Sequence, residues 1–173
     1  EFAEKGVTAY LLRHAFEPEA YFDPDTFLPG KTPAPYHFLT KKHDISFVGH
    51  VNSQNRIDAL DRLFKEFPNF YFGQKLFNEA AKKYAESKIC FNIAMTDDLN
   101  MRCFEVMGAG GFLLTNDIPV MHQFFEDGKH LVLYKDLDDM VAKAKYYLEH
   151  EEEREKIAKA GHEEVLSKHT IHH

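Results

Sequence analysis

The sequence predicts an α/β domain in which helices cover both faces of a parallel β-sheet. Short apolar segments alternate along the chain with amphipathic segments of helical periodicity, and short turns join them. One apolar segment, ICFNIA at residues 89–94, is typical of a strand that is buried on both faces. Right-handed crossovers between such strands give a Rossmann-like three-layer α/β/α domain, which is the fold class we expect.

Strand and helix signals follow one another in a regular order from residue 44. Apolar and aromatic residues predict strands at residues 44–49, 69–72, 89–94, 112–116 and 131–134. Helical periodicity predicts helices at residues 53–66 and 77–87, a short helix at residues 100–109 and a helical turn at residues 120–125. Two polar-faced helices close the chain, and each carries an apolar stripe. The first stripe is Leu137, Met140, Val141, Ala144 and Leu148, and the second is Ile157, Ala158, Val165 and Leu166.

The N-terminal part has a different character. Residues 7–13, VTAYLLR, predict a strand, and the stretch that follows, as far as residue 42, holds five of the seven prolines. A long connection without periodicity is typical of a domain boundary or a functional loop. We therefore expect a terminal strand and interdomain linker at residues 1–42 and the main domain at residues 43–173. Because the chain does not begin with Met, we interpret it as part of a longer protein.

Composition and charge exclude several classes of protein. The net charge of -7 disfavours binding to a nucleic-acid backbone. No apolar run is long enough to span a membrane. Cys90 and Cys103 lack the spacing of a zinc or redox motif, so a reducing, cytoplasmic location is expected. The histidines show no metal-ligand spacing, and the tail with His169, His172 and His173 is expected to be solvated.

The segment at residues 96–116, TDDLNMRCFEVMGAGGFLLTN, carries the strongest functional signal. Asp97, Asp98 and Asn100 are residue types that cap helix N-termini. The first-turn amides of Met101 and Arg102 would then point out of the carboxyl edge of the sheet. A free helix N-terminus beside an arginine predicts an anion-binding site.

Two features of this segment allow more than one interpretation. Arg102 and Glu105 lie three residues apart on one helix face, where they either form a surface ion pair or bind phosphates and ribose hydroxyls respectively. Gly108, Gly110 and Gly111 follow a helix and precede a strand, which favours a helix stop over a phosphate loop. An NAD-binding domain is disfavoured because no GxGxxG follows the first strand.

The same segment resembles the donor-side motif of group 1 glycosyltransferases of the GT-B fold, in the branch of CgeB-like spore maturation proteins. The resemblance rests on Asn100, Arg102, Phe104-Glu105, Met107 and the run AGGFLLT at residues 109–115. Phe47-Val48-Gly49 near the start and His169-Thr170 near the end also match. In the family, two glutamates flank the donor, and the second binds the ribose. Glu105 takes the second position, and Asp97, eight residues earlier, takes the first.

The resemblance implies a function and a set of site residues. The chain would be the C-terminal half of a GT-B glycosyltransferase, which binds a UDP- or GDP-sugar and supports glycosyl transfer to an acceptor hydroxyl. The catalytic residues would be Arg102, Glu105 and Asp97, and the donor-binding residues would be Gly49, His50, Arg56, Asn100, Met101, Arg102 and Glu105. His50 stands where the family usually has Arg, and Arg56 is the nearest replacement; its alternative is a solvated helix residue.

The resemblance also sets expectations for cofactors and partners. No metal or other cofactor is required, because enzymes of this fold usually stabilise the leaving diphosphate with helix amides and basic side chains. The partner would be an N-terminal acceptor-binding domain of the same polypeptide, without which the fragment transfers little or no sugar. The alternative from another class of protein is a non-catalytic nucleotide- or anion-binding module of the same fold.

Overall fold

The computed structural model describes residues 39–75, 77–95 and 99–170. The strand expected at residues 7–13 and almost all of the expected linker lie outside these residues. Five parallel strands form one sheet in the order β2-β1-β3-β4-β5. The strands are β1 (His43–Val48), β2 (Phe70–Gly73), β3 (Ser87–Phe91), β4 (Leu113–Asn116) and β5 (Val132–Tyr134).

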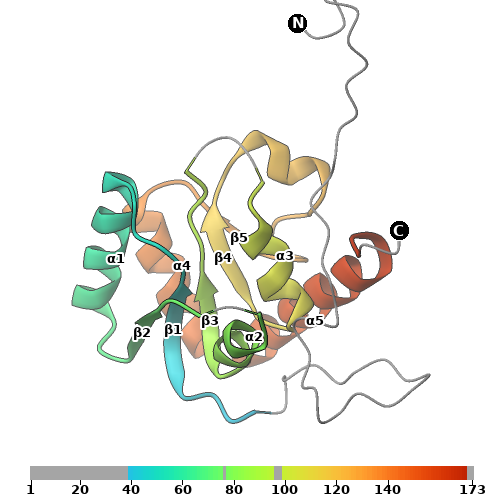
Figure 1. The fold of residues 1–173 in the computed structure, drawn as a ribbon, viewed down its shortest axis with the longest axis horizontal. Coiled ribbons are helices and arrows are strands. Elements are labelled where there is room, and N and C mark those ends of the chain that lie inside the picture. Colours follow the sequence, from blue (N-terminus) through green and yellow to red (C-terminus); the bar gives the residue numbers. More distant parts are fainter. Residues whose placement is uncertain (1–38, 76, 96–98, 171–173) are drawn as a thin grey trace, which may run out of the picture.

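Helices cover both faces of this sheet and confirm the expected three-layer arrangement (Figure 1). Helices α1 (Gln54–Glu66) and α4 (Leu137–Glu149) pack on one face, and α2 (Phe77–Ala85) and α3 (Met101–Gly108) pack on the other. A short 3-10 helix, η5 (Pro119–Gln123), lies between β4 and β5. The last helix, α5 (Glu151–Lys168), contacts both α3 and α4.

The two faces of the sheet bury separate apolar cores, and α5 contributes to both. Ile157 and Ala158, near its start, pack with Ile45, Leu63 and the α4 residues. Val165, near its end, packs with the α3 core instead. The stripe expected on this helix is therefore divided between two cores, because α5 passes from one face of the sheet to the other.

The end of α3 confirms the expected glycine stop. Gly110 has a φ of 79°, a left-handed conformation that favours glycine. The backbone nitrogens of Gly110 and Gly111 donate to the carbonyl oxygens of Met107 and Val106, at 2.9 and 2.8 Å. These two bonds are those of a Schellman motif, which satisfies carbonyl groups at the helix C-terminus.

Strand β3 differs from the expected range, since it begins at Ser87 and its regular pairing ends at Phe91. Beyond Phe91 the backbone of Asn92 still donates to Leu114 O at 2.9 Å. Two residues later, Ala94 N donates to the side chain of Asn116 at 2.7 Å instead of to a strand carbonyl. A side chain of the neighbouring strand thus ends the ladder earlier than the apolar run predicts.

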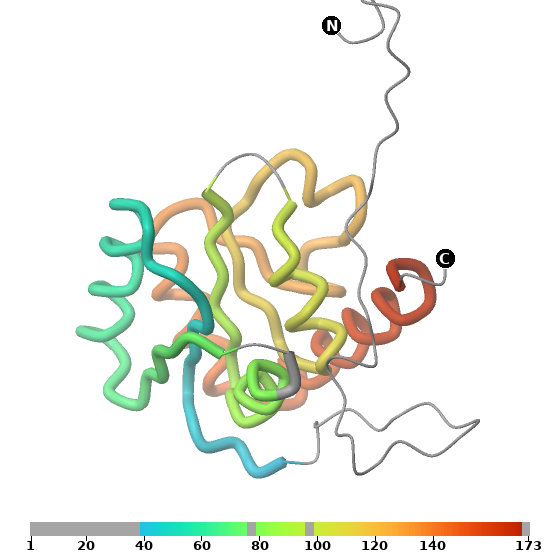
Figure 2. Tube along the Cα trace, in the orientation of Figure 1, coloured from blue at the N-terminus to red at the C-terminus, as the bar shows by residue number. Residues whose placement is uncertain are grey.

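The strand order reverses between β1 and β3, because the chain leaves β1 towards β2 but leaves β3 towards β4. Ligands of open α/β sheets bind at such a reversal, beyond the carboxyl ends of the strands. Contacts of Arg102 with Phe47 and of Arg56 with Ile93 join the end of β1, the end of β3 and the start of α3 at one edge of the sheet. Figure 2 shows the end of β3 and the start of α3 at the top of the trace. This edge holds the residues described next.

Candidate anion-binding site

Arg102, in the first turn of α3, lies against the end of β1. Its guanidinium carbon is 4.8 Å from the centroid of the Phe47 ring, which is a cation–π distance. Its Nη1 donates a hydrogen bond to Oδ1 of Asn92 at 2.9 Å. A Cβ atom on Gly49 would lie only 2.0 Å from Nη2 of Arg102, so the absence of a side chain at Gly49 makes room for this guanidinium. Three contacts therefore hold the charged group in one place.

Arg56, in the first turn of α1, approaches the same ring from the other helix. Its guanidinium carbon is 6.0 Å from the Phe47 centroid, and the residue is only 8% exposed. Nη1 donates to His50 O and to Asn52 Oδ1, and Nη2 donates to Ile93 O, all within 3.2 Å. Arg56 thus ties the segment after β1 to the segment after β3, and it is not the solvated helix residue of the alternative interpretation.

Among the described residues, Arg56 and Arg102, which we call the arginine pair, donate hydrogen bonds only to neutral acceptors. Among residues 39–75, 77–95 and 99–170, the ion pairs include neither arginine. Burial lowers the pKa of Arg56, and the positive charge of Arg102 lowers it further. Two cations held close together without a carboxylate favour the binding of an anion.

The N-terminus of α3 opens at the same edge. Asn100 occupies the N-cap position, but its side chain accepts no hydrogen bond from the first-turn amides. The amide of Asn100 instead pairs with the amide of Asn92, at 3.3 Å in both directions. The expected side-chain cap is therefore wrong for Asn100, and Asp98 lies outside the described residues. Without such a cap, the dipole of α3 and the amides of Met101 and Arg102 add to the positive potential.

The remaining predicted site residues are distributed around this edge. His50 is exposed and follows Gly49 directly, and Met101 is half-buried. Glu105 lies on α3 one turn beyond Met101 and is also half-buried. Asp97 lies outside the described residues. The structure thus brings Gly49, Arg56, Asn100 and Arg102 together by direct contact or through one shared neighbour.

Phe47 and Asn92 are central to this geometry. A role in the site was predicted for neither residue from the sequence. Phe47 is fully buried and lies under both guanidinium groups. Asn92 is fully buried and contacts Arg102, Asn100 and Thr115. A signal for Asn92 was present, because a single amide inside an apolar strand needs buried hydrogen-bond partners.

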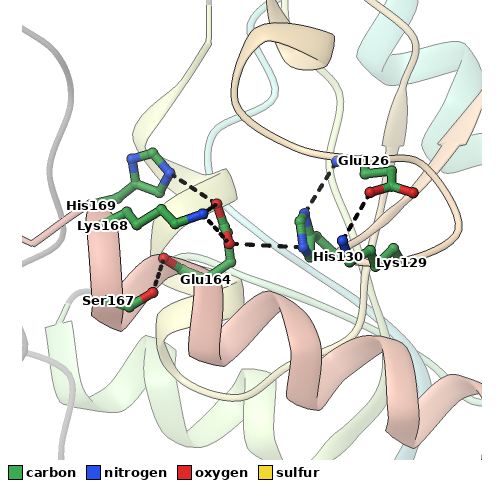
Figure 3. Close-up of polar contacts among 7 residues, drawn as sticks. All are labelled: Glu126, Lys129, His130, Glu164, Ser167, Lys168 and His169. Atoms are coloured by element: carbon green, nitrogen blue, oxygen red, sulfur yellow. Dashed lines mark hydrogen bonds and ion pairs between the residues drawn. The ribbon is translucent and has the colours of Figure 1, made fainter.

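A second polar cluster lies at the end of α5, well away from these arginines in the sequence (Figure 3). Glu164 accepts from Lys168 Nζ with both oxygens, at 2.9 and 3.1 Å. The Nε2 atoms of His130 and His169 each lie 3.9 Å from Glu164. We call these four residues the Glu164 cluster. His169 also packs against Phe104, Phe124 and Phe125 and is half-buried, so it is less exposed to solvent than expected.

Among the described residues, no three His, Cys, Asp or Glu side chains gather as a metal-ligand set. No helix in residues 39–75, 77–95 and 99–170 has the length and apolarity of a membrane span. Cys90 and Cys103 are both buried as free thiols, and burial raises the pKa of each to about 12.

Comparison with known proteins places the chain in a family. The family model described as glycosyl transferase-like matches residues 39–173. The chain belongs to this family. Spore protein CgeB of Bacillus subtilis (strain 168) is 34% identical over 67 residues, which are 39% of this chain and 20% of CgeB. The likeness to CgeB expected from the sequence is thereby confirmed.

Solved structures show the fold of this glycosyl transferase-like domain. The C-terminal domain of the group 1 glycosyl transferase LpcC from Francisella tularensis superposes with a TM-score of 0.67 at 11% identity. That match covers 90% of this chain and 99% of the LpcC domain. A Staphylococcus aureus TarM variant, solved with UDP and two saccharide ligands, gives a TM-score of 0.60 at 14% identity. That match covers 77% of this chain but only 34% of TarM. The expected C-terminal GT-B fold is confirmed.

Proposed function

We propose that this domain binds the diphosphate of a nucleoside diphosphate sugar at the anion-binding site and supports glycosyl transfer. The observation that carries the proposal is the arginine pair, which has no carboxylate partner among the described residues and lies where the strand order reverses. The UDP that accompanies TarM in its crystal structure supports a nucleotide as the anion. UDP- and GDP-sugars are the proposed donors.

Each residue of the site has a proposed role. Arg102 and the amides of Met101 and Arg102 bind the diphosphate, because a guanidinium and a helix N-terminus both favour phosphate oxygens. Glu105 accepts hydrogen bonds from the ribose hydroxyls. Arg56 adds its positive charge from α1. The absence of a side chain at Gly49 leaves room for the guanidinium of Arg102.

The remaining predicted residues complete the proposed site. His50 donates one hydrogen bond to the donor, and Asn100 positions the start of α3 through its contact with Asn92. Asp97, at the first acidic position of the family motif, is proposed to face the transferred sugar.

The proposed chemistry follows from this charge distribution. The acceptor hydroxyl attacks the anomeric carbon, the bond from that carbon to the donor phosphate oxygen breaks, and the nucleoside diphosphate leaves with the bonding electrons. The hydroxyl proton passes to the departing phosphate oxygen. Negative charge grows on the departing phosphate in the transition state. Preorganised guanidinium and amide groups stabilise this charge best, because they need not reorient during the reaction. We propose that no metal ion is needed, so EDTA leaves donor affinity unchanged.

The acceptor site is proposed to belong to a second domain of a longer protein. This chain spans about a fifth of CgeB and a third of TarM, whereas it spans nearly all of the LpcC C-terminal domain. We infer that transfer occurs between the two domains, that the fragment alone transfers little or no sugar, and that the enzyme is cytoplasmic.

Calorimetric titration of the 173-residue chain with UDP, GDP and ADP tests this proposal. Saturable binding of one nucleotide is expected, and Arg102→Ala should weaken it at least about tenfold, the effect of losing a hydrogen bond to a charged group. Glu105→Gln should weaken the nucleotide but not inorganic pyrophosphate, which has no ribose. Arg62→Ala is the matched control, because Arg62 forms surface ion pairs with Glu66 and Asp138.

Two results would contradict the proposal. Binding that is equal in the wild type and in Arg102→Ala would place the nucleotide elsewhere. Binding without any sugar transfer in a longer chain that includes the second domain would instead indicate a non-catalytic nucleotide-binding module.

A further inference from the structure

Asn92 contacts Arg102 of the arginine pair and is fully buried. Its Oδ1 accepts from Nη1 of Arg102 at 2.9 Å, and its Nδ2 donates to Oγ1 of Thr115 at 3.0 Å. The hydroxyl of Thr115 lies 3.4 Å from Oδ1 of Asn116, which also accepts from the backbone of Ala94. A continuous row of hydrogen bonds therefore runs from Arg102 into the interior of the sheet.

This row has only one consistent direction. A guanidinium has donors and no acceptor, so Arg102 must face the oxygen of the Asn92 amide and not its nitrogen. The nitrogen of Asn92 then needs an acceptor, which Thr115 supplies because its own hydroxyl proton is directed to Asn116. Rotation of the Asn92 amide by half a turn would place N–H groups against the guanidinium. Thr115 and Asn116 therefore favour this orientation of Asn92, and the amide of Asn100 pairs with the same amide in both directions at 3.3 Å.

We propose that Asn92 is a positioning residue, which fixes the guanidinium of Arg102 for the ligand of this site without touching that ligand. The inference rests on the proposed function for the identity of the ligand. The neutral amide matters as much as the contact, because a carboxylate at this place would form an ion pair with Arg102 and cancel its charge. Of the described contacts of the guanidinium, an apolar side chain would leave the Phe47 ring and the Gly49 backbone.

Two substitutions separate the contact from the charge. Asn92→Ala removes the hydrogen bond but keeps both arginine charges, whereas Asn92→Asp keeps the shape and adds a negative charge. With inorganic pyrophosphate as the probe, Asn92→Ala should lower the affinity about tenfold, as expected for one hydrogen bond to a charged group. Asn92→Asp should lower it more, and the dependence of its affinity on salt should be weaker because one cation is neutralised. Asn92→Ala should retain the salt dependence of the wild type.

NMR of the arginine side chains in the unliganded chain reports on Arg102 independently of pyrophosphate binding. In the wild type, the two Nη signals of Arg102 should be resolved, because the bond to Asn92 slows rotation of the guanidinium. In Asn92→Ala they should merge into one averaged signal. Thr115→Val should broaden the two Nη signals. Thr115→Ser, which retains the hydroxyl, should instead show the same signals as the wild type. Asn69→Ala is the control, since Asn69 is exposed and its side chain bonds the backbone oxygen of Lys42 and the side chain of His43, away from the arginine pair.

The outcomes are distinguishable. Resolved Nη signals in Asn92→Ala that match the wild type would overturn the positioning role, whatever pyrophosphate does. If the NMR results are as expected but pyrophosphate binds neither the wild type nor any variant, the positioning role stands and the proposed function fails. If Asn92→Ala does not fold, the Thr115→Val and Thr115→Ser pair decides, because a failure of Thr115→Val to alter the Arg102 signals would also overturn the proposal.

Discussion

The arginine pair and the Glu164 cluster differ in charge balance. In the Glu164 cluster, a half-buried carboxylate bonds the exposed Lys168 ammonium and lies beside two histidines (Figure 3). In the arginine pair, two cations meet only neutral oxygens and an aromatic ring among the described residues. A balanced cluster connects parts of the fold, whereas an unbalanced one needs an ion from outside. Charge balance therefore separates the Glu164 cluster from the arginine pair, the group that we propose to bind a ligand.

The largest expected effect is the loss of pyrophosphate binding in Arg102→Ala. The variant removes both the guanidinium and its charge, and the affinity should fall about a hundredfold, as for a doubly hydrogen-bonded arginine. Lys168→Ala removes a cation of the balanced cluster and should leave the affinity unchanged. Calorimetry on both variants measures the difference. Equal losses would show that only net charge matters, and the distinction between the two clusters would fail.

Gly49→Ala should weaken pyrophosphate binding about tenfold, because the new Cβ would displace the Arg102 guanidinium. The φ of Gly49 is 155°, which is unfavourable for alanine, so a loss of stability should accompany the loss of affinity. Titration at a temperature where the variant is fully folded separates the two effects. Gly128→Ala, also at a positive φ but in open space, is the control for strain alone. Unchanged affinity in Gly49→Ala would indicate that the guanidinium tolerates displacement.

Glu164→Gln tests the balanced cluster by its effect on stability. The amide keeps the shape of the side chain but loses its charge next to Lys168 and the two histidines. The free energy of unfolding should fall by about 1 kcal/mol, since Glu164 is only partly shielded from water. Denaturant unfolding measures it, and pyrophosphate affinity should not change. Glu163→Gln, one residue away and exposed, is the matched control.

The smallest expected effect is the pH dependence of stability that His130 contributes. Burial lowers the pKa of His130 below its ordinary value of 6.5; Lys129 and Lys168 also lower it, while Glu164 and Glu126 oppose them. The unfolded chain therefore binds a proton more readily, and the free energy of unfolding should decrease as the pH falls through 6.5. In His130→Gln, the loss of unfolding free energy on acidification should be smaller than in the wild type, by less than about 1 kcal/mol.

The same measurement has a control. Burial also lowers the pKa of His43, so part of the slope should remain in His130→Gln and should disappear when His43→Gln is added. A slope of unchanged size in His130→Gln would contradict the prediction.

Local sequence patterns predicted much of this fold, because each strand, helix and glycine stop depends on neighbouring residues. The Schellman motif at Gly110 and Gly111 is such a case. Contacts between distant segments were harder to predict. The position of Phe47 below both arginines joins β1, α1 and α3, and no periodicity in any one of them indicates it.

The site was predicted unevenly for the same reason. Arg102 followed from a motif within one segment, and the structure places it at the carboxyl edge of the sheet. The burial of Arg56 did not follow, because its partners His50 and Ile93 belong to two different loops. The side chain of Asn100 was expected to cap its own helix, but the buried amide of Asn92 binds it instead.

The path of α5 has a consequence for how the domain unfolds. One end of this helix fills the core on one face of the sheet, and the other end fills the core on the opposite face. Neither core can lose α5 without exposing apolar side chains in the other, so the two layers are expected to open together in a single cooperative transition. The amides of α5 should then exchange with solvent hydrogen as slowly as those of the central strand β3. A helix that joins the two cores thus limits the dynamics of the whole domain.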